Sequence, residues 1–239
     1  MTSEKNPGDT LVVAIDGPSG VGKSTTARLV AAALGIPYLD TGAMYRALGL
    51  MIVERGVDPG DRRAVVAALA DVAVELRGRS DGGLVVLLDG RDVGGRIRTP
   101  RVSESTSRIA VYPEVRARLV VIQREFALRA GGVLEGRDIG SRVVPETRFK
   151  FFLEAPLAVR IERRRRELIA NGRDADAGEL AAEIAERDRR DQERTASPLI
   201  CTPEHERVDT SLGGPEEVAA VILASVRRRL HGSRVTSRG

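Results

Sequence analysis

Residues 17–24 constrain the fold of this chain more than any other segment. They read Gly-Pro-Ser-Gly-Val-Gly-Lys-Ser, which fits the pattern G-x-x-x-x-G-K-[ST] at every position. A β-branched apolar run, residues 10–15, precedes the motif, and helical spacing follows it over residues 25–35. In a strand–turn–helix of this kind, backbone N–H groups and a helix N-terminus surround a phosphate group. The sequence therefore predicts a P-loop nucleotide-binding fold.

Lysine is rare in this chain, so a lysine within the motif is informative. Lysine occurs only at Lys5, Lys23 and Lys150, and the other 35 of the 38 basic residues are arginines. Lys23 is expected to reach the β- and γ-phosphates of ATP as a compact charge, and the Ser24 hydroxyl to hold Mg²⁺. ATP and Mg²⁺ are thus the predicted cofactors. The predicted ATP-binding residues of this loop are Gly17, Pro18, Ser19, Gly20, Val21, Gly22, Lys23, Ser24 and Thr25.

Apolar runs alternate with helical spacing along most of the chain. This alternation predicts an α/β fold in which a parallel sheet carries helices on both faces. A single domain is expected over residues 10–231, with flexible tails at 1–9 and 232–239. The predicted strands are 10–15, 36–40, 149–155 and 205–211, and the predicted helices are 25–35, one that Thr41 caps, 101–129, 156–168 (ended by Asn171 and Gly172), 176–195 (with Asp176 as cap) and 216–230.

One region departs from this alternation. Between residues 58 and 100, two runs, VAVELRG and GLVVLLDGRDV, alternate more like antiparallel strands than like helices, and a turn at residues 80–83 joins them. Such a pattern is typical of antiparallel strands. We therefore expect a small antiparallel insertion in the parallel sheet.

Composition argues against several classes of protein. The 239 residues include one cysteine, Cys201, and the N-terminus lacks the apolar segment of a signal peptide. No apolar run approaches the ~18 residues of a membrane span. A cytoplasmic protein without a membrane partner, and a monomer, is expected. The basic run at 163–166 has no interleaved aromatic residues for stacking bases, so a nucleic-acid partner is not expected.

Three further motifs follow the P-loop. They are DTGAMYR at residues 40–46, EGRDIG at 135–140 and ERDRRDQER at 186–194. Together with the P-loop, and in this order, they resemble the motifs of bacterial cytidylate kinases, which belong to the nucleoside monophosphate kinase family. The resemblance extends over residues 12–230, nearly the whole chain. Two positions depart from it, because Glu135 stands where an aspartate is expected and Ser24 stands where some relatives have glycine.

This resemblance implies an activity and a set of site residues. The implied reaction transfers the γ-phosphate of ATP to CMP or dCMP. The implied architecture adds an acceptor-binding region at about residues 41–110 and a short mobile lid at about 160–190. Lys23, Arg187 and Arg190 are the implied catalytic residues, and Arg160, Arg163 and Arg164 match the lid arginines that bind ATP. The residues matching the acceptor site are Thr41, Arg46, Ser107, Arg116, Arg137, Asp138, Arg187, Asp191 and Arg194.

The third motif also has a meaning without the resemblance. On a helix, Arg187, Arg190, Asp191 and Arg194 share one face. Guanidinium forks on one face suit the binding of two phosphate groups brought together. The alternative is a solvated helix with salt bridges, for which Glu186, Asp188 and Glu193 supply the acids.

The remaining polar motifs leave alternatives open. Asp40 and Thr41 mark either a ligand site or merely a strand end and helix cap. Asp138 could pair with Arg137, or its carboxylate could accept from the amino group of cytosine while Arg116 donates to the ring. A uracil carbonyl opposite Asp138 would then be rejected. His205 is interpreted as structural or at the surface.

A monophosphate acceptor explains the absence of a catalytic base from these motifs. Its phosphate oxygen is already anionic, so catalysis reduces to alignment and charge neutralisation. A kinase of a hydroxylated metabolite is an alternative, with Asp40 or Asp138 as base. A nucleotide-dependent switch or RNA-binding protein is another, although no N-K-x-D motif is present.

Overall fold

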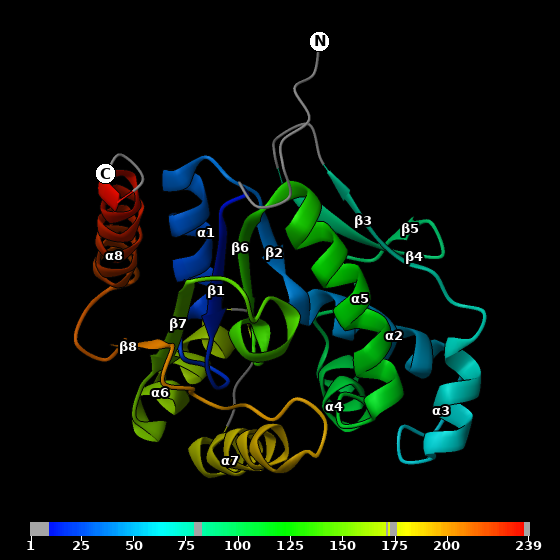
Figure 1. Ribbon diagram of the computed structural model, residues 1–239. Coiled ribbons are helices and arrows are strands. Elements are labelled where there is room, and N and C mark those ends of the chain that lie inside the picture. The colour runs from blue at the N-terminus through cyan, green and yellow to red at the C-terminus, as the bar shows by residue number, and fades with distance from the viewer. Residues whose placement is uncertain (1–9, 79–82, 171, 173–175, 237–239) are drawn as a thin grey trace.

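A five-stranded parallel sheet forms the centre of the molecule (Figure 1). This computed structural model describes residues 10–78, 83–170, 172 and 176–236. Every neighbouring pair in the central sheet is parallel, as predicted. In order across the sheet, the strands are β2 (Tyr38–Asp40), β6 (Gly132–Gly136), β1 (Val12–Asp16), β7 (Phe149–Glu154) and β8 (Glu206–Asp209).

Helices cover both faces of this sheet, again as predicted (Figure 1). One face carries α1 (Lys23–Leu34) and α8 (Pro215–Thr236), and the other carries α2 (Thr41–Glu54), α4 (Pro100–Ile109) and α5 (Pro113–Ala130). Alternate residues of β1 contribute to two apolar clusters. Val13 and Ile15 pack in the cluster with α1 and α8, whereas Val12 and Ala14 pack in the cluster with α2, α4 and α5. Because β1 is buried on both faces, residues 12–15 are all apolar, and only its last residue, Asp16, is polar.

The glycines of the P-loop permit a tight path from β1 into α1. Gly17 has a φ of 153°, and a Cβ atom there would lie 2.3 Å from the carbonyl oxygen of Leu153 in β7. Gly22, immediately before α1, has a φ of 96°. A residue with a Cβ atom rarely adopts such positive φ angles, and at position 17 its Cβ atom would also clash with Leu153. The loop therefore has the strand–turn–helix geometry that the motif predicts.

The antiparallel insertion lies beside α2. It contains β3 (Val74–Gly78), β4 (Leu84–Leu88) and β5 (Arg91–Asp92), with β4 in the middle. Of the predicted turn at 80–83, residues 80–82 lie outside the described residues. A helix that the sequence did not predict, α3 (Arg62–Leu69), precedes β3; it is eight residues long and buries only Val65 and Leu69.

Most helix boundaries lie within two residues of the prediction, but three features of the helices differ from it in kind or extent. The single helix expected at 101–129 is split, because Pro113 cannot continue a helix from α4 and instead begins α5. The cap of α2 is Asp40 rather than Thr41, since the Asp40 carboxylate accepts from the Ala43 N–H at 2.9 Å. Helix α8 continues beyond residue 230 to Thr236. No helix in the described ranges is long and apolar enough to cross a bilayer.

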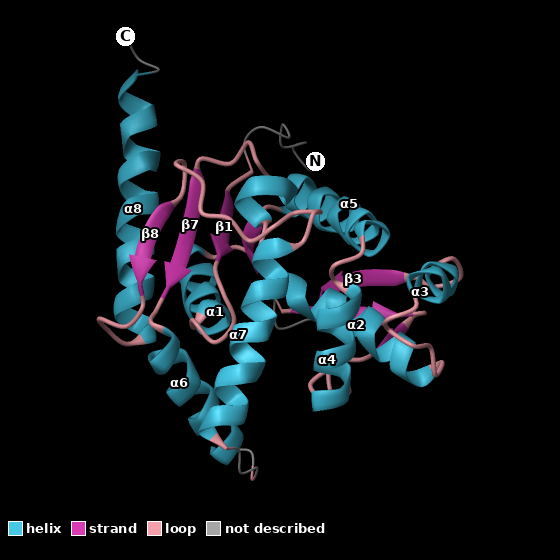
Figure 2. Cartoon of the chain, turned by 90° about the horizontal axis from the view of Figure 1, so that it is seen from below, coloured by secondary structure: helices cyan, strands magenta, loops and turns pink. Residues whose placement is uncertain are grey.

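Helices α6 (Leu157–Ala170) and α7 (Ala177–Glu193) pack together and extend away from the sheet (Figure 2). Helix α6 ends just before Asn171, the predicted stop, which lies outside the described residues. Asp176 caps α7, as predicted, because its carboxylate accepts from the backbone N–H groups of Gly178 and Glu179. Helix α7 lies beneath the carboxyl ends of the central strands (Figure 1).

Candidate functional site

A cavity of about 290 Å³ opens at the carboxyl ends of β1, β2 and β6. Ligands of open α/β sheets bind at this end of the strands. The P-loop forms one side of the cavity, and α2, α4, α7 and the segment after β6 form the others. Eight cationic side chains and six carboxylates line it in the described part of the chain. The charge of the cavity therefore favours an anionic ligand.

Lys23 lies in the P-loop and is almost fully buried. Its ammonium group donates to the carbonyl of Pro18 at 2.7 Å. Burial, reinforced by the charges of Arg137 and Arg187, lowers the pKa of Lys23 from 10.5 to about 7 against the opposing effect of Glu135 and Asp191. A bound phosphate would favour the charged ammonium and raise this pKa again.

This shift predicts that nucleotide binding takes up a proton. At about pH 8.5 the free Lys23 is mostly neutral, whereas the phosphates of ATP are fully ionised and do not contribute. Binding should then take up about one proton, and affinity should fall as pH rises above 7. Calorimetric titration with ATP, in buffers of different ionisation enthalpy, measures the uptake directly. An observed enthalpy that does not vary with the buffer would contradict the prediction.

Asp16 anchors the base of the P-loop. Its two carboxylate oxygens accept from the N–H groups of Ile139 and Gly140, each at 2.8 Å, in the short π-helical turn η1 (Ile139–Val143). His205 Nε2 lies 3.3 Å from Asp16, and its Nδ1 accepts from the N–H of Thr202. His205 is therefore structural rather than at the surface, and it connects the last part of the chain to the P-loop.

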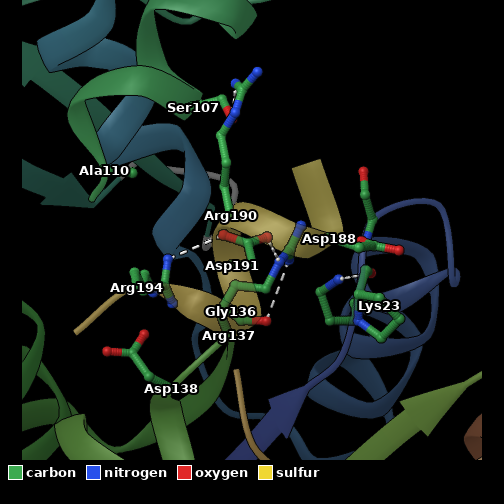
Figure 3. Close-up of polar contacts among 12 residues, drawn as sticks. Lys23, Ser107, Ala110, Gly136, Arg137, Asp138, Asp188, Arg190, Asp191 and Arg194 are labelled. Carbon is green, nitrogen blue, oxygen red and sulfur yellow. Dashed lines mark hydrogen bonds and ion pairs between the residues drawn. The ribbon is translucent and has the colours of Figure 1, made fainter. Parts of the chain in front are cut away.

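Buried ion pairs hold arginines on the side of the cavity opposite the P-loop. Arg116 donates to Asp138 Oδ2 at 2.5 Å, and both side chains are nearly inaccessible. Asp191 accepts from Arg137 at 2.8 Å and from Arg194 at 3.0 Å (Figure 3). These arginines lower the pKa of Asp191, although burial alone would raise it. The pairing of Asp138 with Arg137, one of the sequence-based alternatives, is wrong.

Several polar groups of this cavity have no protein partner. Four buried polar groups make no hydrogen bond to any described residue: Arg46 Nε, Arg116 Nε, Arg194 Nη2 and the Tyr45 hydroxyl. Arg187 makes neither a hydrogen bond nor an ion pair within the same ranges, and burial and Arg137 lower its pKa to about 10, so it stays charged at neutral pH. Because buried donors are rarely left unpaired, these groups indicate a polar, anionic ligand.

The match to a known family agrees with this cavity. A model of the cytidylate kinase family matches residues 13–228. The chain belongs to the cytidylate kinase family. Proteins named cytidylate kinase from Pelotomaculum thermopropionicum and Symbiobacterium thermophilum are each 46% identical to it, and the alignments cover 90% and 91% of this chain and 95% and 96% of those proteins. The resemblance predicted from the four motifs is thus confirmed.

A solved structure of an uncharacterized protein from Eubacterium ventriosum is similar in fold. It has a TM-score of 0.50 and 12% sequence identity, and the superposition covers 92% of this chain and 99% of that one. This likeness concerns the fold alone.

Most of the cytidylate kinase motif residues meet at the cavity. Some predicted residues belong to the P-loop and the start of α1 without lining the cavity, namely Gly17, Pro18, Val21, Gly22 and Thr25. Arg190 lies at the edge of the cavity, where it donates to Ser107 at 3.1 Å and pairs with Glu186 (Figure 3). The predicted residues that line the cavity are Ser19, Gly20, Lys23, Ser24, Thr41, Arg46, Ser107, Arg116, Arg137, Asp138, Arg164, Arg187, Asp191 and Arg194.

Two of the predicted lid arginines contact the protein rather than the cavity. Arg160 is buried and donates to the carbonyls of Ser19 and Ala155. Arg163 donates to the hydroxyl and the carbonyl of Thr210 and to the carbonyl of Val21. In this structure both guanidinium groups donate to backbone carbonyls of the P-loop outside the cavity. Of the three predicted lid arginines, only Arg164 lines the cavity.

Several residues of the cavity were not predicted from the sequence. Tyr45 immediately precedes the predicted Arg46, and its place in the DTGAMYR motif could have identified it. Arg98 pairs with Asp40 at 3.3 Å at the rim of the cavity, but no local pattern in the insertion singles it out. Glu183 also lines the cavity, one helical turn before Arg187.

The oxygen ligands of the cavity fit a magnesium ion that is shared with nucleotide phosphates. Ser24 and Glu135 both line the cavity. Glu135 Oε1 accepts from the Tyr38 hydroxyl at 2.7 Å, and its Oε2 makes no hydrogen bond among the described residues. The described ranges contain no cluster of three or more metal-ligating side chains. Mg²⁺ is commonly held by one or two protein oxygens with phosphates and water, which matches this donor set.

Proposed function

We propose that this chain transfers the γ-phosphate of ATP to CMP or dCMP, which gives ADP and CDP or dCDP. The observation that carries the proposal is the cavity itself, where a P-loop faces a group of arginines with unpaired donor atoms. One side suits a triphosphate and the other a monophosphate. Membership of the cytidylate kinase family supports this assignment of donor and acceptor.

The P-loop side binds the donor in this proposal. The N–H groups of residues 17–25 surround the ATP phosphates, and Lys23 leaves the Pro18 carbonyl to contact the β- and γ-phosphates. Ser24 and Glu135 would hold Mg²⁺, which when bound neutralises charge that develops on the transferring group. Arg164, at the rim, is placed to contact ATP when α6 and α7 close.

The opposite side binds the acceptor. Arg46, Arg137, Arg187 and Arg194 offer guanidinium groups to the monophosphate, with Thr41 beside them. Asp191 holds two of these arginines and faces the ribose. Arg190 must release Ser107 to reach the transferring group. Ser107, Arg116 and Asp138 form the pocket for cytosine.

Catalysis then depends on alignment rather than on proton transfer. The acceptor phosphate is already anionic, so no residue has to act as a general base. The arginines and Lys23 offset the repulsion between two negative ligands. Closure of the acceptor region (residues 41–110) and of the lid (160–190) would exclude water, which otherwise competes as acceptor. We further propose that the chain acts as a cytoplasmic monomer, because one chain supplies both sides of the cavity.

Asp138 should determine base selectivity. Its Oδ2 is taken by Arg116, whereas its Oδ1 makes no hydrogen bond among the described residues and can accept from the cytosine amino group. An Asp138→Asn variant should lower the ratio of kcat/KM for CMP over UMP by about 10-fold or more, since its amide also offers a donor to the uracil carbonyl. Steady-state kinetics with both nucleotides measures this ratio. An unchanged ratio in a folded variant would refute the role.

An acceptor-dependence assay tests the function as a whole. ADP release is measured with ATP and Mg²⁺ in the presence of CMP, dCMP, UMP, AMP or shikimate, with a Lys23→Ala control. We expect CMP and dCMP to give the fastest release. Release with shikimate alone would indicate a kinase of a hydroxylated metabolite. ATP consumption that CMP does not accelerate would refute the proposed function.

A further inference from the structure

Asp188 is a buried carboxylate on α7 that the function described above does not use. The alternative interpretation of this helix, as a solvated helix with salt bridges, counted Asp188 among its acids, but the Asp188 side chain is only 11% exposed. Its Oδ1 accepts from the backbone N–H of Ser19 in the P-loop at 3.2 Å, and its Oδ2 pairs with the guanidinium of Arg160 in α6. That alternative is therefore wrong for Asp188.

Arg160 completes a closed set of contacts with the same loop residue. Its Nη1 donates to the Ser19 carbonyl at 3.1 Å as well as to Asp188, and its Nε donates to the Ala155 carbonyl at 3.2 Å. Both backbone polar groups of Ser19 are thus bound. We refer to Asp188, Arg160 and Ser19 as the strut, because together they connect α7 and α6 to the P-loop.

Helix α7 also carries the residues on the acceptor side. Leu180, Ile184 and Asp188 form its buried edge, and Arg187, Asp191 and Arg194 lie along the adjacent edge that faces the cavity. In Figure 3, Asp188 lies toward Lys23, whereas Arg194 lies toward Asp138, with Asp191 between them. One rigid helix therefore contacts the donor loop through Asp188 and the acceptor site through its neighbours.

We propose that Asp188 is a positioning residue, which sets the separation between the P-loop and the acceptor-binding arginines of α7 through the strut. The inference rests on the proposed function, since it concerns the alignment of the two phosphates. Misplacement of reacting groups by about 1 Å costs about 100-fold in rate even when binding is retained. A buried ion pair suits this role because its geometry is specific even where its net contribution to stability is small.

The main test is an Asp188→Asn variant. The amide keeps the shape and an oxygen that accepts from the Ser19 N–H, but it removes the charge that pairs with Arg160. We expect kcat to fall by about 10- to 100-fold. The dissociation constants of ATP alone and of CMP alone should each change by less than about threefold, since the side chains that bind them stay in place. A purely structural role would not separate kcat from binding in this way.

A matched control lies on the same helix. Glu193 pairs with Arg189 at 2.5 Å on the exposed side of α7, so Glu193→Gln makes the same chemical change outside the strut. This variant should retain wild-type kcat. The kinetics of each variant are measured at a temperature well below its unfolding midpoint. Arg160→Lys serves as a second probe of the strut. A lysine ammonium cannot reproduce the guanidinium contacts to Asp188, Ser19 and Ala155 together. This second variant should lower kcat in the same way as Asp188→Asn.

The outcomes separate the two proposals. If the wild type phosphorylates CMP and Asp188→Asn keeps kcat within about twofold, the positioning role is wrong and the function stands. If kcat and both affinities fall together, the strut is a general structural contact and the role is also wrong. If the wild type shows no acceptor-dependent ATP use, the function itself fails. If Asp188→Asn and Arg160→Lys each lose kcat with binding retained, both proposals are supported.

Discussion

Replacing Lys23 with methionine is expected to lower kcat for CMP phosphorylation by about 10³-fold. Methionine fills a similar volume in this buried position but carries no charge to place on the γ-phosphate as it moves. At saturating ATP the loss appears in kcat, and the affinity for ATP should fall as well, because the charged ammonium that contacts the phosphates is gone. Release of ADP in a coupled assay, at saturating ATP and CMP, measures the effect.

A Lys23→Arg variant gives the matched control. It keeps a positive charge but brings a planar fork into a space where the lysine ammonium reaches the Pro18 carbonyl at 2.7 Å. Partial activity of this variant would show that charge matters as well as shape. A methionine variant that kept more than about one tenth of wild-type kcat would show that Lys23 does not contact the transferring group.

Replacing Arg187 with alanine should have an effect of similar size, about 10³-fold in kcat/KM for CMP. Arg187 faces the cavity from α7 and has no ion-pair partner in the described part of the chain, so its charge is available to a ligand. Its loss removes a cation that the acceptor phosphate and the transition state would share. Steady-state kinetics with varied CMP at saturating ATP measures the loss.

Arg189 provides the comparison for this variant. It lies on the exposed side of the same helix and pairs with Glu186 and Glu193. Arg189→Ala removes the same side chain, and we expect it to leave kcat/KM within about twofold of the wild type, as is usual for exposed ion pairs. Equal losses in the two variants would mean that α7, rather than the Arg187 charge, is what each substitution disturbs.

The central fold was predictable because its determinants are local. One continuous stretch of sequence contains strand β1, the glycines of the P-loop and the helix that follows. Within it, the residue types themselves favour the observed conformations: β-branched residues a strand, glycines a tight turn. The antiparallel insertion was predictable for the same reason, since the alternation along 74–78 and the short apolar run at 84–88 are visible in the local sequence. The break between α4 and α5 was missed, although Pro113 marks it, because helical spacing continues on both sides.

The contacts within the site were harder to predict. Asp138 pairs with Arg116, which is distant in sequence, and not with its neighbour Arg137. Asp188 belongs to a helix whose surface pattern is highly charged, and only the position of α7 against the P-loop shows that this carboxylate is buried. Helical periodicity identifies a face, but it cannot say which edge of that face meets another element. Such partners depend on tertiary packing.

The anchoring of the P-loop by distant residues has a consequence for biosynthesis. The loop is complete in sequence once residue 25 has been made, yet two of its supporting contacts each join residues that lie 189 positions apart in the chain. His205 approaches Asp16 at 3.3 Å, and the Thr210 hydroxyl donates to the Val21 carbonyl at 2.9 Å. Contacts of such high sequence separation form only after the intervening chain has been made. A nascent chain in which residues 205–210 have not yet been made should therefore bind ATP poorly, so nucleotide binding becomes possible only after this segment has been synthesised.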